Sequence, residues 1–216
     1  MIKKIALFAF VLISVLDIIG IIFKVESLLY VFKPFILLSL LFLYSKSVSE
    51  TNTWYATALI FSFFGDVFLM YPGQIPFKIG LISFLIAHIL FIKIVMGRIK
   101  NVSFLNILTA VIPFAVFFLL LIYIIKDSLG ELFMPVIIYG FTISMFGVVS
   151  LINYVETKSK EAIWMLIGAI VFMISDTILA INKFYNPAHI FEVGIMVTYI
   201  LAQYLIFRSM VQKNAL

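Results

Sequence analysis

Apolar stretches long enough to cross a membrane alternate with short polar segments along the whole chain. An α-helix needs roughly 20 mostly apolar residues to span a bilayer. Dividing the chain on this basis predicts eight transmembrane helices, at about residues 5–23, 28–45, 53–71, 76–97, 104–125, 132–152, 162–182 and 188–208. The predicted fold is therefore all-α, a polytopic membrane bundle of eight helices that forms a single domain over residues 1–216.

The polar segments between the predicted helices are all too short to hold a soluble domain. They cover residues 24–27, 46–52, 72–76, 98–103, 126–131, 153–161 and 183–187. Pro76 and Pro135 lie near helix starts, where a missing N–H is harmless, whereas Pro34 and Pro113 lie inside spans and predict kinks. Any chemistry must therefore come from side chains within the bundle or at its rim.

The distribution of Lys and Arg predicts the orientation in the membrane. Eight spans place both termini on one side, and that side carries the larger share of basic residues. They are Lys3, Lys4, Lys46, Arg98, Lys100, Lys158, Lys160, Arg208 and Lys213, against Lys24, Lys78, Lys126 and Lys183 on the other. Because Lys and Arg concentrate in cytoplasmic loops, we expect both termini in the cytoplasm, and the inner membrane as the location if the protein is bacterial. The first apolar run lacks a small-x-small cleavage site, so we expect it to be a retained helix rather than a signal peptide.

Composition narrows the class of protein further. Hydrophobic residues make up 65% of the chain and charged residues 12%, which excludes a water-soluble domain and a disordered chain. The chain contains no cysteine, which excludes disulfides, zinc–thiolate sites and a cysteine nucleophile. The net charge is +5, but the basic residues form no stripe or face, so nucleic acid is not an expected partner.

The two halves of the chain resemble each other at three landmarks in the same order. The pairs are Phe32-Lys33-Pro34 with Phe133-Met134-Pro135, Gly65-Asp66 with Ser175-Asp176, and Ala87-His88 with Ala202-Gln203. Four helices separate the members of each pair, so the halves would have the same orientation, related by an axis along the membrane normal. We therefore predict a 4+4 internal duplication. The alternative is that these matches are coincidental, because an apolar chain uses a limited set of residue types.

Ionisable side chains inside membrane spans cost roughly 2.5–3.5 kcal/mol and mark candidate functional sites. The predicted spans contain Asp17, Lys33, Asp66, His88, Lys93, Asp176 and Glu192. Lys93 is close enough to a helix end to snorkel, and His88 lies nearer the midplane. The other five lie at a similar depth, roughly 6–9 Å below the non-cytoplasmic rim, at 1.5 Å per residue. They predict a polar cavity that opens to one side.

Helical spacing adds neutral polar residues to this cavity, but each residue also has a structural interpretation. Ser62 lies one turn before Asp66, Ser175 adjoins Asp176, and Tyr139, Tyr199 and Gln203 fall on neighbouring polar faces. Either aspartate could instead form a buried ion pair with Lys33, and His88 could be an interhelical hydrogen-bonding residue. Asp17 and Glu192 could be solvated charges at the rim, and the two tyrosines could be packing residues.

The chain resembles the YhhN family of membrane proteins, the lysoplasmalogenases, over roughly residues 28–208. The matching stretches are Lys33-Pro34, Ser62-x-x-Gly65-Asp66-x-x-Leu69-Met70, Gly80-Leu81-x-x-Phe84-Leu85-x-Ala87-His88, Tyr139 with Met145, Gly168-x-x-x-Phe172-x-x-Ser175-Asp176-x-x-Leu179-Ala180-x-x-x-Phe184, and Thr198-Tyr199-x-x-Ala202-Gln203-x-Leu205. The resemblance implies hydrolysis of the vinyl ether bond of lysoplasmalogens, giving a fatty aldehyde and a glycerophospho-alcohol. It also implies Asp66 and Asp176 as the catalytic pair.

Two carboxyl groups suffice for this reaction, as they do for glycosidases with an oxocarbenium-like transition state. One would protonate the alkene and the other would activate water. The expected substrate-binding residues are Lys33, Ser62, His88, Tyr139, Ser175, Tyr199 and Gln203. No cofactor or metal is required, and two histidines are too few for a His-rich zinc site, although an Asp/Asp/His metal site stays open. The expected partners are a lysophospholipid substrate and membrane lipids. The alternatives are a transporter with a cavity lined by membrane carboxylates and a non-enzymatic lipid-binding or scaffold protein.

Overall fold

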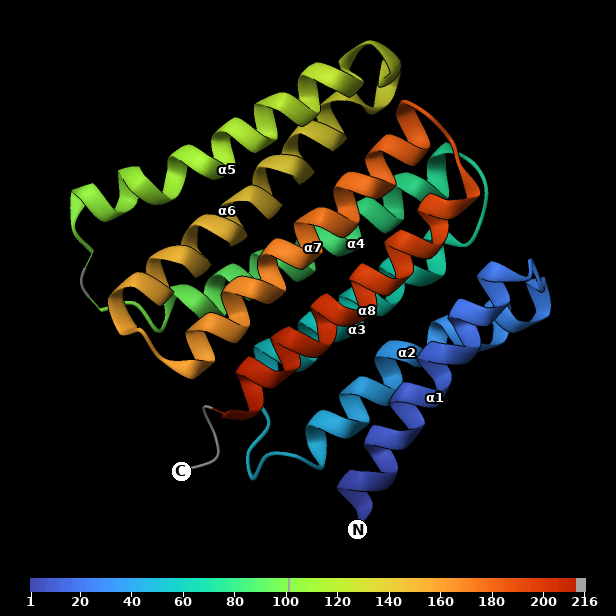
Figure 1. Cartoon of the computed structure of the whole chain (residues 1–216), viewed down its shortest axis with the longest axis horizontal. Coiled ribbons are helices and arrows are strands. Elements are labelled where there is room, and N and C mark those ends of the chain that lie inside the picture. The colour runs from blue at the N-terminus through green and yellow to red at the C-terminus, as the bar shows by residue number, and fades with distance from the viewer. Residues whose placement is uncertain (101, 213–216) are drawn as a thin grey trace.

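The computed structural model describes residues 1–100 and 102–212, and over these residues it is an all-helical bundle (Figure 1). The helices are α1 (Ile2–Ile22), α2 (Glu26–Ser45), α3 (Thr53–Leu69), α4 (Gln74–Met96), α5 (Phe104–Ile125), α6 (Phe133–Thr157), α7 (Lys160–Phe184) and α8 (His189–Gln212). Two short 3-10 turns, η1 (Lys126–Ser128) and η2 (Gly130–Leu132), join α5 to α6. The predicted fold class is confirmed. Lys213, which was counted for the orientation, lies outside the described residues.

Seven of the described helices are long and apolar enough to cross a membrane, so the protein is an integral multi-pass membrane protein. The remaining helix, α3, is apolar but has only 17 residues, at the lower limit of the roughly 17–25 residues needed for a span. Pro76 and Pro135 lie in the first turns of α4 and α6, as predicted. Pro34 and Pro113 lie inside α2 and α5, and both helices continue through them.

The predicted turn at residues 153–161 is wrong. Helix α6 continues to Thr157, and α7 already begins at Lys160. Asn153 is 1% exposed and belongs to the helix, because a helix can extend past the apolar segment from which its span was predicted. Lys158 ends α6 in the left-handed conformation, with φ 48°. The Ser159 side chain then accepts a hydrogen bond from the Ala162 N–H at 3.2 Å and caps α7.

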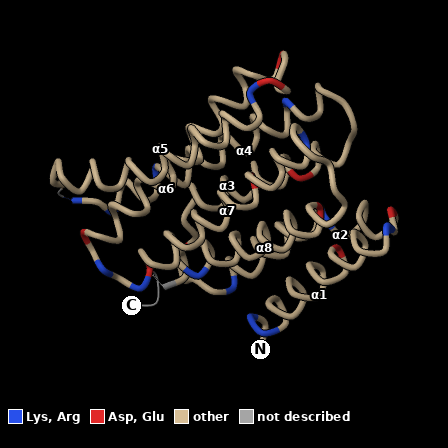
Figure 2. The backbone as a smooth tube through the Cα atoms, turned by 45° about the horizontal axis from the view of Figure 1, so that its top comes forward, with Lys and Arg blue, Asp and Glu red and all other residues tan. Residues whose placement is uncertain are grey.

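Antiparallel hairpins of consecutive helices build the bundle. Hairpin α5–α6 forms one edge and α1–α2 the other, with α3, α4, α7 and α8 between them (Figure 1). Each half, α1–α4 and α5–α8, thus places its first hairpin at an edge of the bundle (Figure 1), and the 4+4 duplication stays a prediction. Most charged residues lie at helix ends (Figure 2). Which end faces the cytoplasm stays a prediction.

Glycines allow the central helices to approach closely. A Cβ on Gly65 would lie 2.5 Å from the Phe84 ring, so α3 packs directly on α4 next to Asp66. A Cβ on Gly168 would lie 2.9 Å from Ile206, so α7 lies directly against α8 at this position. These contacts hold the helices that carry the two aspartates of the site.

Candidate functional site

A polar cavity of about 400 Å³ lies between α1, α2, α3, α4, α7 and α8. Residues on its wall flank the α1–α2, α3–α4 and α7–α8 connections, so the cavity reaches the end of the bundle opposite the start of α1. Its polar lining consists of Glu26, Tyr30, Lys33, Asp66, Ser175, Asp176, Asn182, Glu192 and Tyr199. The structure thus gathers both predicted catalytic aspartates, together with three of the predicted binding residues, around one space.

Asp66 and Tyr199 form the first of two Asp–Tyr pairs in the site. Asp66 lies in the last turn of α3, 4% exposed, and its Oδ2 accepts a hydrogen bond of 2.7 Å from the Tyr199 hydroxyl of α8. The Tyr199 ring is fixed by edge-on contacts with Phe84 and Phe172, at ring-centroid distances of 5.9 and 5.4 Å. This pair therefore has a well-defined position on the cavity wall.

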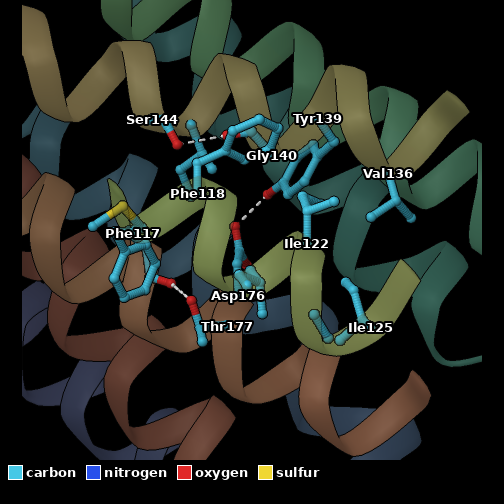
Figure 3. A pocket seen from close by; sticks show the side chains of 14 residues that line it. Phe117, Phe118, Ile122, Ile125, Val136, Tyr139, Gly140, Ser144, Asp176 and Thr177 are labelled. Carbon is cyan, nitrogen blue, oxygen red and sulfur yellow. Dashed lines mark hydrogen bonds between the residues drawn. The ribbon is translucent and has the colours of Figure 1, made fainter. Parts of the chain in front are cut away.

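Asp176 and Tyr139 form the second pair. The Tyr139 hydroxyl of α6 donates a hydrogen bond to Asp176 Oδ2 of α7 (Figure 3). Ser175, its neighbour, donates its hydroxyl proton to the Ile195 carbonyl of α8 at 2.9 Å. Asp176 is thereby held between α6 and α8, and it lines the same cavity as Asp66.

Lys33 brings a cation to the cavity wall. A Cβ on Gly20 would lie 2.9 Å from Leu28, so the α1–α2 hairpin is tight and its antiparallel register places Asp17 level with Lys33. The Lys33 charge acts on both Asp17 and Asp66. Asp17 has no exposed surface, so the interpretation of Asp17 as a solvated rim charge is wrong. Glu192, in contrast, lies at the rim, where its exposed carboxylate contacts His189 Nδ1 at 3.1 Å.

A second, apolar pocket lies on the other side of Asp176, between α5, α6 and α7 (Figure 3). Its volume is about 40 Å³, and Asp176 lines both this pocket and the polar cavity. The remaining wall consists of Phe117, Phe118, Leu121, Ile122, Ile125, Val136, Tyr139, Gly140, Ile143, Ser144, Met173, Thr177 and Ala180. Asp176 thus lies where a polar and an apolar space meet.

A family model for the YhhN family matches residues 28–210. The chain belongs to the YhhN family. The match covers α2 to α8, so Lys33 and both Asp–Tyr pairs lie within it, whereas Asp17 on α1 precedes it. No solved structure matches the chain.

Three predicted site residues of this YhhN protein, Ser62, His88 and Gln203, have no exposed surface and line neither the cavity nor the pocket. His88 Nδ1 lies 2.8 Å from the Phe84 carbonyl of its own helix, so this nitrogen donates, and its ring lies 4.5 Å from that of Phe172. In the described part of the chain His88 Nε2, Ser62 Oγ and the Gln203 amide are buried without a hydrogen-bond partner. Their role in binding stays a prediction.

Sequence reasoning missed Glu26, Tyr30 and Asn182 as lining residues of the cavity. Glu26, Tyr30 and Lys33 are spaced by four and three residues, which places them on one face of α2. This spacing is the sequence signal that could have identified Glu26 and Tyr30 as lining residues. Asn182 accepts a hydrogen bond from the Ala188 N–H at 2.8 Å and so also shapes the α7–α8 connection. Among the described residues, no group of three or more His, Cys, Asp or Glu side chains is arranged to hold a metal.

Proposed function

We propose that this protein is a membrane-embedded hydrolase that cleaves the vinyl ether bond of lysoplasmalogens, which are 1-alkenyl lysophospholipids. The products would be a fatty aldehyde and a glycerophospho-alcohol. The observation that carries the proposal is the pair of carboxyl groups, each bound by a tyrosine hydroxyl, on the wall of one cavity inside a membrane bundle. Membership of the YhhN family supports the same activity.

The reaction suits a pair of carboxyl groups because a vinyl ether has no acyl carbon for a nucleophile to attack. A carboxylic acid delivers its proton to the alkene carbon that is β to the ether oxygen, and the π electrons form the new C–H bond. The resulting oxocarbenium carbon is attacked by water, which loses a proton to the other carboxylate. The hemiacetal hydroxyl then gives its proton to the first carboxylate, the C–O bond to glycerol breaks, and the glycerol oxygen takes up the proton held by the second carboxyl group. The balance is alkenyl ether plus water to aldehyde plus alcohol.

The surroundings of the two aspartates support different roles for them. Asp66 lines the polar cavity together with the Lys33 ammonium and does not border the apolar pocket, which suits the carboxylate that orients water and accepts its proton. Asp176 borders the apolar pocket, which suits the acid that protonates a hydrocarbon carbon. The assignment therefore makes Asp176 the general acid and Asp66 the general base.

The polar cavity suits the head group of a lysophospholipid. Lys33 offers an ammonium group on the cavity wall, and a lysine is a common phosphate-binding residue. Ser175 and Tyr199 lie on the same wall as the two aspartates, where they can help to position glycerol. The volume of about 400 Å³ falls within the range of small-molecule sites.

Aldehyde release tests the proposal. Purified protein in detergent is incubated with a 1-alkenyl lysophospholipid and, as a matched control, with the 1-acyl lysophospholipid that has the same head group. We expect aldehyde and free glycerophospho-alcohol from the alkenyl lipid, and no fatty acid from the acyl lipid. A folded protein that releases no aldehyde would contradict the proposal. Transport of a lysolipid by that protein in liposomes would support the carrier alternative.

A further inference from the structure

We infer that the apolar pocket between α5, α6 and α7 binds the first carbons of the substrate's hydrocarbon chain, the carbons next to the vinyl ether. This inference rests on the proposed function. It assigns the two ends of a lysolipid to opposite sides of Asp176, with the head group in the polar cavity and the chain in the apolar pocket. The bond to be cleaved then lies beside the carboxyl group of Asp176.

The chemistry of the pocket wall suits a hydrocarbon. Phenylalanine, leucine, isoleucine, valine and methionine side chains form most of it. Its three hydroxyl groups direct their protons to protein acceptors: Ser144 to the Gly140 carbonyl at 2.8 Å, Thr177 to the Met173 carbonyl at 2.7 Å, and Tyr139 to Asp176 (Figure 3). A polar ligand would have to compete with these bonds, whereas a methylene chain would not.

The position of α5 gives the chain a route to the bilayer. Helix α5 lies at the outer edge of the bundle (Figure 1) and buries three of its 22 residues, while α6 buries eleven of 25. Phe117 and Phe118 of α5 are half-buried and line the pocket. A chain whose first carbons occupy the pocket would therefore reach lipid past the partly exposed rings of Phe117 and Phe118.

The size of the pocket limits what it holds. A cavity that holds one water molecule has a volume of roughly 10–15 Å³. About 40 Å³ therefore holds only the first few carbons of a chain, and the remainder lies along the lipid-facing surface. The pocket would fix the alkene carbon that receives the proton rather than measure the full chain length.

Filling the pocket tests this inference. A Cβ on Gly140 would lie 2.8 Å from the Phe118 ring, so Gly140→Leu projects into the pocket. We expect kcat/KM for the alkenyl lysolipid to fall roughly tenfold or more, and the double variant Gly140→Leu/Phe118→Ala to recover much of it. Phe141→Leu, on the exposed side of the same helix, is the matched control and should leave kcat/KM unchanged. An equal loss in this control, or no loss in Gly140→Leu, would overturn the assignment.

Photo-crosslinking tests the chain site without requiring cleavage. The probe is a 1-O-alkyl lysophospholipid, which has no vinyl ether, with a diazirine within its first few chain carbons. We expect crosslinks to α5 and α6 near Phe118 and Tyr139, and their loss in Gly140→Leu. Crosslinks here in a protein that releases no aldehyde would support the chain site and contradict the hydrolase. Aldehyde release with crosslinks elsewhere would overturn the chain site and leave the hydrolase intact.

Discussion

The two ends of the bundle use buried polar groups in different ways. At the end where α4 and α8 finish, Arg98 Nη1 donates to Ser209 Oγ at 2.9 Å, and Ser209 in turn donates to the Glu161 carbonyl at 2.7 Å. These bonds tie the turn after α4 to the start of α7 and the end of α8. At the other end, Lys33, Asp66 and Asp176 surround a cavity of about 400 Å³. Polar groups that bond one another stabilise the fold, whereas polar groups that line a cavity are available to a ligand.

This difference also bears on the carrier alternative. A carrier that works by alternating access must open the side that is closed in a given structure. In this protein that side is held by Arg98, whose Nη2 also lies 2.9 Å from Met210 Sδ. Partial burial of the Arg98 guanidinium lowers its pKa. The hydrogen-bonded end opposite the polar cavity fits the proposed hydrolase, because a hydrolase needs access to its cavity from one side only.

The largest expected effect comes from removing either carboxyl group. Asp66→Asn and Asp176→Asn should each reduce aldehyde release roughly 10²–10⁴-fold, the usual contribution of a general acid or base. Each amide fills nearly the same volume as the carboxyl group, so we expect the unfolding midpoint in detergent to change little. An unstable variant, or one that keeps its activity, would favour a structural role for that aspartate.

Replacing the cation of the cavity should have the next largest effect. Lys33→Gln removes the ammonium group that we propose binds the phosphate. A hydrogen bond to a charged group contributes about 1.5–3 kcal/mol, so kcat/KM should fall roughly ten- to hundredfold. A rise in KM would identify phosphate binding, and a fall in kcat would identify support of Asp66. Lys33→Arg, which keeps the charge, should retain more activity than Lys33→Gln. Unchanged kcat/KM in Lys33→Gln would show that Lys33 takes no part in binding or catalysis.

Removing the tyrosine hydroxyl of either Asp–Tyr pair should reduce activity less than removing the carboxyl group. Tyr199→Phe and Tyr139→Phe each remove one hydroxyl and its hydrogen bond to a carboxyl oxygen. A net loss of about 0.5–1.5 kcal/mol corresponds to a fall in kcat of up to roughly tenfold. Kinetics of both variants beside the parent protein measure this loss, and a loss as large as that of Asp66→Asn would mean that the tyrosine itself transfers a proton.

The smallest effect on catalysis should come from a substitution at the hydrogen-bonded end of the bundle, where Arg98 contacts Ser209. Arg98→Ala removes the hydrogen bond to Ser209 and should lower the free energy of unfolding by about 1.5–3 kcal/mol. Thermal unfolding in detergent checks this loss, and kcat at a temperature where the variant stays folded should match that of the parent protein. A large fall in kcat without a loss of stability would contradict the division between the two ends.

Hydropathy and depth together predicted a substantial part of the fold and the site. The spans follow from apolar length, and the gathering of Lys33, Asp66 and Asp176 follows from their similar depth. The apolar pocket was not predicted, because it depends on which of many similar apolar faces meet. The burial of Asp17 was not predicted either, because it depends on the close approach of α1 to α2 at Gly20. Both features arise from packing between helices, which periodicity along one helix does not specify.

The most direct test of the proposed mechanism is to run the cleavage in D₂O and measure the mass of the aldehyde. If a carboxyl group protonates the alkene carbon, the aldehyde should carry one deuterium on the carbon next to its carbonyl. Asp176→Asn should form this product at a rate reduced roughly 10²–10⁴-fold. Aldehyde without that deuterium, or undiminished release by folded Asp176→Asn, would contradict the mechanism.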